Sequence, residues 1–193
     1  MTLLENILMH NETFVQKQEY KRFSTTKFPN KKLLIVTCMD TRLLTLLPQA
    51  LGLQNGDAKV IKNAGAVITR PFGNMMRSII LGIYEFQVKE ICVIGHEDCG
   101  MAGLQAEPLL EKIKQQGIDA TCICTLQQAG IDLSTWLTGF QNVQESVQHS
   151  VEIIRQHPLA PSNVPVHGLV IHPQTGSLEI VVEGYSYANA RNS

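Results

Sequence analysis

The chain has 193 residues, of which 44% are apolar and 17% charged, and its formal net charge is −1. A chain of this length buries roughly 70% of its unfolded surface, so we expect one domain over residues 1–193. The near-zero charge and the lack of a basic block argue against nucleic acid as a partner, and no apolar stretch reaches the ~18 residues of a membrane span.

The first 28 residues are expected to form a helical arm ahead of the main fold. Apolar side chains recur there at helical spacing and form one amphipathic stripe, made by Leu3, Leu4, Ile7, Leu8, Phe14 and Val15. Such a stripe can pack on the sheet of its own chain or on a second subunit.

Three short apolar runs then alternate with two helix-length stretches. The runs cover residues 33–36, 59–61 and 91–95, and the helical stretches cover about 43–51 and 74–86. The runs are rich in branched residues and continuous rather than alternating, which is typical of parallel strands covered on both faces. This β-α-β-α-β order predicts an α/β fold with a mostly parallel central β-sheet, right-handed crossovers and flanking helices.

The second half of the chain continues this pattern less clearly. Residues 107–116 read as a helix that Gly117 ends, and Ser134 is expected to cap a longer helix that runs to about Gln156, before Pro158. Residues 166–171 and 178–182 read as strands on either side of a turn at residues 173–176.

Polar clusters follow two of the apolar runs. Cys38, Asp40 and Arg42 come after the first run, and His96 and Cys99 come after the third. The carboxyl ends of parallel strands form the ligand-binding edge of such sheets, so the two clusters are expected to meet. Two thiolates and one imidazole make a zinc ligand set with one coordination position open, which is typical of a catalytic zinc site.

The second run ends in a loop of small residues, Asn63, Ala64 and Gly65, at the same edge of the sheet. Small residues let the backbone approach a ligand closely. The loop is therefore a candidate substrate contact, and the alternative is that it serves only as a tight turn.

Together these motifs resemble the β-class carbonic anhydrases, in their compact bacterial form. The resemblance rests on C-x-D-x-R at residues 38–42, K-N-A-G at residues 62–65 and G-H-x-x-C-G at residues 95–100. It implies Zn²⁺ bound by Cys38, His96 and Cys99, with Asp40 and Arg42 as the catalytic dyad. It also implies a lyase that hydrates carbon dioxide reversibly to bicarbonate, and a homodimer or higher oligomer paired through the N-terminal arm.

The sequence departs from the family pattern at two places and leaves the substrate open. Lys62 stands where the family usually has arginine, and residues 69–73 replace a commoner acidic pair. One alternative is a hydrolase of carbonyl sulfide or carbon disulfide that uses the same zinc site. Another is a zinc- or bicarbonate-binding module without turnover, against which the retained Asp40 and Arg42 argue. In some relatives the aspartate itself occupies zinc at rest, and the sequence favours neither state.

The remaining cysteines and the acidic residues near the motifs are not part of the expected ligand set. Cys92 lies inside an apolar run and is expected in the core. Cys122 and Cys124 lack the C-x-x-C spacing and the neighbouring histidine of a second metal site. Glu97 and Asp98 either support the metal ligands or face solvent. Five cysteines, an odd number, and no export signal at the N-terminus fit a reducing cytoplasm.

Overall fold

The computed structural model describes residues 1–190, and within them the strands form one sheet in the order β2-β1-β3-β4-β5. β2, β1, β3 and β4 run parallel to one another, and β5 is antiparallel to β4 at the edge. This arrangement confirms the predicted α/β fold with a mostly parallel sheet. The strands are β1 (Leu33–Cys38), β2 (Ala58–Asn63), β3 (Glu90–His96), β4 (Val166–Ile171) and β5 (Leu178–Val182).

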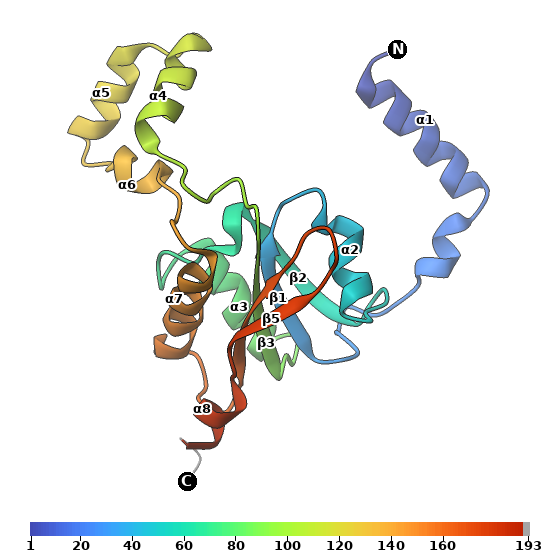
Figure 1. Cartoon of the computed structure of the whole chain (residues 1–193). Helices are drawn as coiled ribbons and strands as arrows, with labels where there is room; N and C mark the ends of the chain where they lie inside the picture. Colours follow the sequence, from blue (N-terminus) through green and yellow to red (C-terminus); the bar gives the residue numbers. More distant parts are fainter. Residues whose placement is uncertain (191–193) are drawn as a thin grey trace.

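The helices are distributed over both faces of the sheet and over two projections from it (Figure 1). α1 extends away from the sheet at the N-terminal end, and α4, α5 and α6 form a second projection at the other side. The helices are α1 (Leu3–Gln16), α2 (Leu43–Ala50), α3 (Asn74–Tyr84), α4 (Ala106–Gln115), α5 (Ala120–Gln128), α6 (Leu133–Leu137), α7 (Val143–Gln156) and α8 (Tyr185–Ala190), with short 3₁₀ turns η1 (Glu19–Phe23) and η2 (Ala64–Ala66). None of these helices, within residues 1–190, is long and apolar enough to cross a bilayer.

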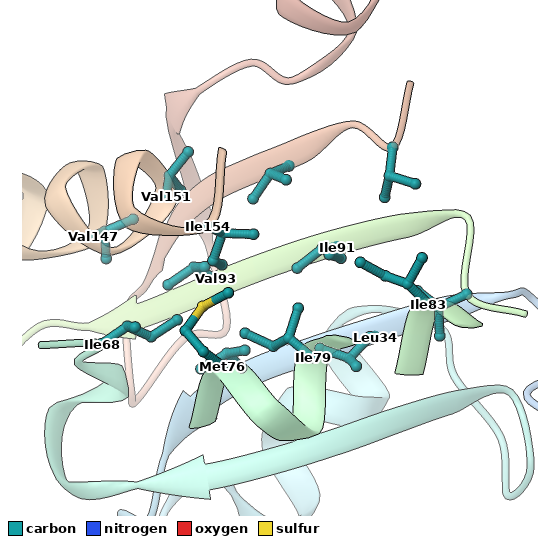
Figure 2. Close-up of a cluster of buried hydrophobic side chains, with 14 of the residues drawn as sticks. Leu34, Ile68, Met76, Ile79, Ile83, Ile91, Val93, Val147, Val151 and Ile154 are labelled. Carbon is teal, nitrogen blue, oxygen red and sulfur yellow. The ribbon is translucent and has the colours of Figure 1, made fainter. Parts of the chain in front are cut away.

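Alternating side chains of the central strands fill two separate cores. On one face, β1 and β3 contribute Leu34 and Val93 to a cluster with α3 and α7, which Figure 2 shows from the side. On the other face, Ile35 and Ile94 pack against α2. Five of the six residues of β1 are buried, as expected of a parallel strand covered on both sides.

The prediction of one helix from Ser134 to about Gln156 is wrong, because this segment forms two helices, α6 and α7. Between them, the Gly139 and Phe140 amides donate to the carbonyls of Leu104 and Met101 at 2.9 and 3.2 Å. A Cβ at Gly139 would overlap the Met101 carbonyl oxygen, so only glycine allows this approach. The pairing with the loop before α4 replaces the helical hydrogen bonds at this point.

Side-chain caps also differ from the expectation. Asp132 accepts the Thr135 amide at 3.0 Å at the start of α6, and Asn142 accepts the Glu145 amide at 2.9 Å at the start of α7. Ser134 instead lies inside α6, where its hydroxyl donates to the Asp132 carboxylate. α5, which carries Cys122 and Cys124, had no counterpart among the predicted elements.

Candidate metal centre

The two polar clusters meet at the carboxyl ends of β1 and β3. Cys38 and His96 are the last residues of these adjacent strands, and Cys99 follows in the loop after β3. One donor atom from each of the three lies within 4.8 Å of the others, and the side chains are buried. The prediction that these residues share one place in the fold is confirmed.

The imidazole of His96 is oriented by the backbone. Its Nδ1 lies 2.8 Å from the Glu97 carbonyl oxygen. A carbonyl can only accept, so Nδ1 carries the proton and Nε2 presents a lone pair. Nε2 is fully buried and has no hydrogen-bond partner among the described residues, as expected of an atom whose natural partner is a metal ion.

The two thiols are spaced as ligands of one ion. Cys38 Sγ and Cys99 Sγ are 3.9 Å apart, which is too far for a disulfide. Two thiolates on one tetrahedral zinc, each at about 2.3 Å from it, would be ~3.8 Å apart. The donor set therefore fits zinc, with three protein ligands and a fourth position open.

The loop after β2 supports Cys38. The Gly65 amide donates to Cys38 Sγ at 3.3 Å, and Gly65 has a φ of +76°. A Cβ at this position would lie 2.9 Å from the Phe140 ring, so both the conformation and the space require glycine. Of the three loop residues singled out as substrate contacts, the structure thus places Gly65 against a metal-ligand candidate.

Contacts within the site lower the pKa of one thiol, whereas burial raises the pKa of the other. Burial alone would raise the pKa of Cys38, but the neighbouring His96 ring and the hydrogen bond that the Gly65 amide donates outweigh it, so the pKa falls to about 7. Burial and the neighbouring Cys38 raise the pKa of Cys99 to about 11. The pKa of His96 is raised, since its contacts with Cys38 and the Glu97 carbonyl outweigh burial.

Asp40 and Arg42 form a tightly hydrogen-bonded pair beside the donor set. Arg42 Nε and its backbone amide donate to Asp40 Oδ1 at 3.0 and 2.8 Å, and Nη2 donates to Oδ2 at 2.8 Å. These bonds hold the pKa of the Asp40 carboxyl far below its usual range and raise that of Arg42. Asp40 Oδ2 lies 3.7 Å from His96 Nε2, so the carboxylate faces the donor set in its ionised form.

The acidic residues between His96 and Cys99 separate into two different roles. Asp98 contacts Arg42 through both its side chain and its carbonyl oxygen. Glu97 instead lies 3.9 Å from His172 Nε2 and makes no contact with the dyad. Sequence reasoning left this choice open, because only the turn of the loop decides which side chain points toward Arg42.

A cavity of about 600 Å³ opens next to the site. Asn63 and Ala64 line one wall, and Met101 and Phe140 another. The Asn63 side chain donates to the Val67 carbonyl at 2.6 Å, which leaves its buried Oδ1 without a partner in the described residues. The sequence analysis missed the third wall, which comes from α6 and the segment after it and includes Asp132, Thr135, Trp136 and Thr138.

The other cysteines lie away from this site. Cys92 is half-buried in β3, where burial and the Glu90 carboxylate raise its pKa to about 12. Cys122 and Cys124 are exposed on α5. Within residues 1–190, Cys38, His96 and Cys99 are the one group of three or more such side chains spaced to hold a metal ion.

Comparison with known proteins gives a consistent result. The family model described as carbonic anhydrase matches residues 33–178. "Putative carbonic anhydrase YvdA" of Bacillus subtilis (strain 168) is 59% identical over 96% of this chain and 94% of its own length. A carbon disulfide hydrolase of Acidithiobacillus thiooxidans is 35% identical over 77% of this chain and 76% of its own. The crystal structure of β-carbonic anhydrase isoform I from Trichomonas vaginalis superposes with a TM-score of 0.86 at 36% identity, covering 96% of this chain and all of the other.

Proposed function

The chain belongs to the β-carbonic anhydrase family, and we propose that it catalyses the reversible hydration of carbon dioxide to bicarbonate and a proton. The single observation that supports this most directly is the joint presence of an open three-ligand donor set and an ionised Asp40 facing it. A structural zinc site would have a fourth protein ligand in place of the carboxylate.

In this proposal Cys38, His96 and Cys99 hold Zn²⁺. Zinc supplies Lewis-acid chemistry, which generates hydroxide near neutral pH. His96 binds through Nε2, since the Glu97 carbonyl holds the proton on Nδ1. The Gly65 amide stabilises the Cys38 thiolate by donating a hydrogen bond to its sulfur.

Asp40 orients the nucleophile and Arg42 keeps Asp40 ionised. An ionised carboxylate has about four lone-pair sites, and Arg42 occupies two on Oδ1 and one on Oδ2. The remaining acceptor site is on Oδ2, the oxygen nearer His96. Oδ2 can therefore accept the proton of the attacking oxygen in a hydrogen bond and turn a lone pair toward carbon dioxide.

Substrate reaches the site through the 600 Å³ cavity in this proposal, with Asn63 and Ala64 of its lining as substrate contacts. The wall of Met101 and Phe140 is apolar, which suits carbon dioxide. The unpartnered Asn63 Oδ1, Thr135 of α6 and Thr138 just after it offer polar groups to bicarbonate.

We also propose that the chain is one domain whose arm, residues 1–28, joins it to a second copy in a homodimer. No residue of α1 is buried, and Leu3, Leu4, Ile7 and Leu8 of its apolar stripe are each more than half exposed. Exposed apolar surface costs about 25 cal/mol per Å², so a covered stripe is more stable. Analytical ultracentrifugation should give a mass twice the 21.4 kDa of one chain. A variant without residues 1–28 should instead have the mass of a single shortened chain.

A cytoplasmic location is part of the proposal, because a site built from two thiolates requires reduced cysteines. Within residues 1–190 none of the five cysteines is paired in a disulfide.

Stopped-flow hydration of carbon dioxide by the zinc-loaded protein, from pH 6.5 to 9, tests the proposed activity. Carbon disulfide is assayed in parallel, because a relative bears that activity in its name. Hydration of carbon dioxide supports the proposal. Hydrolysis of carbon disulfide without hydration would move the assignment to the sulfur substrate, and neither reaction at one zinc per chain would leave a binding module.

A further inference from the structure

The Arg42 guanidinium has a second acidic partner besides Asp40. Nη1 donates to Asp98 Oδ2 at 2.7 Å, and Nη2 donates to the Asp98 carbonyl oxygen at 2.8 Å. With the bonds from Nε and Nη2 to Asp40, four of the five guanidinium N–H groups have an acceptor. Arg42 is thus fixed from both sides, by the end of β1 and by the loop after β3.

The backbone of Asp98 is shaped for this contact. Its φ is +51°, in the left-handed region that non-glycine residues seldom adopt, although aspartate and asparagine do so more readily than most. Both the carboxylate and the carbonyl of this one residue bond to the same guanidinium. The loop between His96 and Cys99 therefore serves the arginine as well as the two ligand candidates that flank it.

Asp40 has two competing partners. Its Oδ2 is 3.7 Å from His96 Nε2, somewhat more than the roughly 3.3 Å between two nitrogen or oxygen ligands of one tetrahedral zinc. A small rotation would bring the carboxylate to the open metal position, and zinc accepts aspartate readily. The bonds from Arg42 oppose this rotation, and their strength depends on how firmly Arg42 itself is held.

We propose that Asp98 is a positioning residue that anchors the Arg42 guanidinium and thereby keeps Asp40 paired with Arg42 and off the metal position. The inference deepens the proposed function, on which it rests, by assigning this site an accessible resting state. Asp98 contacts neither metal ligand through its side chain in this account and acts only through Arg42.

Orientation rather than charge attraction carries the effect. The Asp98 side chain is 84% exposed, and ion pairs at such positions contribute little energy because water and salt screen them. Two acceptors at fixed positions nevertheless restrict a long, rotatable side chain to one orientation, and a planar guanidinium depends on such geometry for its bidentate bond to a carboxylate.

Azide binding to the cobalt(II)-substituted protein tests the proposal without relying on turnover. Azide needs the open metal position, and its binding changes the visible absorption of cobalt. The variants are Asp98→Gly, which removes the side chain and suits the positive φ, and Asp98→Asn, which keeps a neutral acceptor of the same size. Glu97→Gln is the matched control, since it removes a charge one residue away without touching Arg42.

Asp98→Gly is expected to weaken azide binding about tenfold and Asp98→Asn about threefold, since a neutral acceptor retains part of a charge-assisted bond. The control should stay within about twofold of the unaltered protein. Loss of a negative charge near the metal would by itself strengthen azide binding, so electrostatics alone predicts the opposite sign.

A double variant checks that Asp98 acts through Asp40. In an Asp40→Asn background the carboxylate can no longer compete for the metal, so adding Asp98→Gly should leave azide affinity unchanged. Equal azide affinity in Asp98→Gly, Asp98→Asn and the control would overturn the proposal, as would an effect of the same size in both backgrounds. If Asp98→Gly does not fold, the Asp98→Asn titration decides by itself.

Carbon dioxide hydration by the same proteins separates this inference from the proposed function. If the unaltered protein is inactive but the order of azide affinities holds, the activity is wrong and the role of Asp98 stands. If the unaltered protein is active and all proteins bind azide alike, the activity stands and the role of Asp98 is overturned.

Discussion

The central sheet carries two pairs of a cysteine and a histidine on adjacent strands, and within residues 1–190 only one pair belongs to a group of side chains spaced to hold a metal ion. Cys38 and His96 end β1 and β3, whereas Cys92 and His167 are register partners within β3 and β4. Each histidine also has a carboxylate nearby, since Asp40 lies 3.7 Å from His96 and Glu90 lies 3.3 Å from His167. Residue type therefore does not separate the pairs.

The hydrogen bond at Nδ1 separates the two histidines. His96 donates from Nδ1 to a carbonyl, so Nε2 has a free lone pair. His167 accepts the Gly184 amide at Nδ1 at 3.1 Å, so its Nε2 bears the proton of the neutral ring and faces Glu90. His157 and His172 also accept backbone amides at Nδ1. Within residues 1–190, four histidines thus make a hydrogen bond at Nδ1. Of these four, only His96 has its proton on Nδ1, which leaves Nε2 free to bind a metal.

The surroundings of the two thiols also favour Cys38 over Cys92 as a metal ligand. Hydrogen bonds lower the pKa of Cys38 to about 7 despite its burial, and burial beside Glu90 raises that of Cys92 to about 12. A strand end offers backbone amides that are not used in the sheet, whereas the middle of a strand does not. Position along the strand, more than residue type, therefore decides which cysteine belongs to the group spaced to hold a metal ion.

Replacing the cysteine of each pair by serine gives the largest expected difference in zinc affinity. Cys38→Ser should weaken zinc binding about 1,000-fold, because a binding free energy of roughly 10–16 kcal/mol is shared among three or four ligands. Cys92→Ser should leave the affinity within a few-fold of the unaltered protein. Competition with a zinc chelator measures both, and a comparable loss in Cys92→Ser would break the distinction.

Removing the charge of Asp40 is the next largest change. Asp40→Asn should lower kcat/KM for carbon dioxide about 100-fold, at the lower end of what proton-handling groups contribute, while one zinc per chain stays bound. Asp119→Asn, the same change at the cap of α5, serves as control and should leave the rate unaltered. An active Asp40→Asn variant would show that the carboxylate beside His96 has no more part in turnover than the one beside His167.

Thiol alkylation measures the pKa difference directly in the metal-free protein. Only the thiolate reacts, and a pKa of about 7 means that the thiolate fraction of Cys38 rises about tenfold between pH 6 and pH 8. Cys92, with its pKa raised to about 12, should stay unmodified over that range. Iodoacetamide labelling with peptide mass analysis follows each residue, and zinc should protect Cys38. Faster labelling of Cys92 would contradict the comparison.

The smallest effect is expected at the second histidine. The Tyr185 hydroxyl donates to Glu90 Oε1 at 2.9 Å, and its ring packs on His167. Tyr185→Phe removes the hydrogen bond and keeps the ring. The free energy of unfolding should therefore fall by only about 0.5 kcal/mol at this half-exposed position. Urea denaturation gives the value. Zinc affinity should not change. A change would show that the surroundings of His167 influence the site of Cys38 and His96.

The metal-ligand candidates could be predicted because their signals are local. A short apolar run followed by Cys38 or by His96 marks a strand end, and the parallel sheet brings such ends together without further information. The apolar residues of β1 and β3 are continuous rather than alternating, and this pattern also predicted a sheet covered on both faces.

Other features depend on contacts between distant segments and could not be read from local patterns. The break between α6 and α7 arises because Gly139 and Phe140 bond to the loop before α4, about 35 residues earlier in the chain. The pairing of Arg42 with Asp98 rather than Glu97 depends on the positive φ of Asp98, which non-glycine residues seldom adopt and which the local sequence does not specify. The tautomers of the histidines likewise follow from backbone groups of other segments.

X-ray absorption at the zinc edge of the zinc-loaded protein tests the central claim most directly. The account predicts one zinc per chain, bound by two sulfurs at ~2.3 Å and by imidazole nitrogen, with a light atom in the fourth position. Substitution of Cys38 by serine should remove this spectrum, and substitution of Cys92 should leave it unchanged. A site with one sulfur or none, or a spectrum that depends on Cys92, would contradict the account.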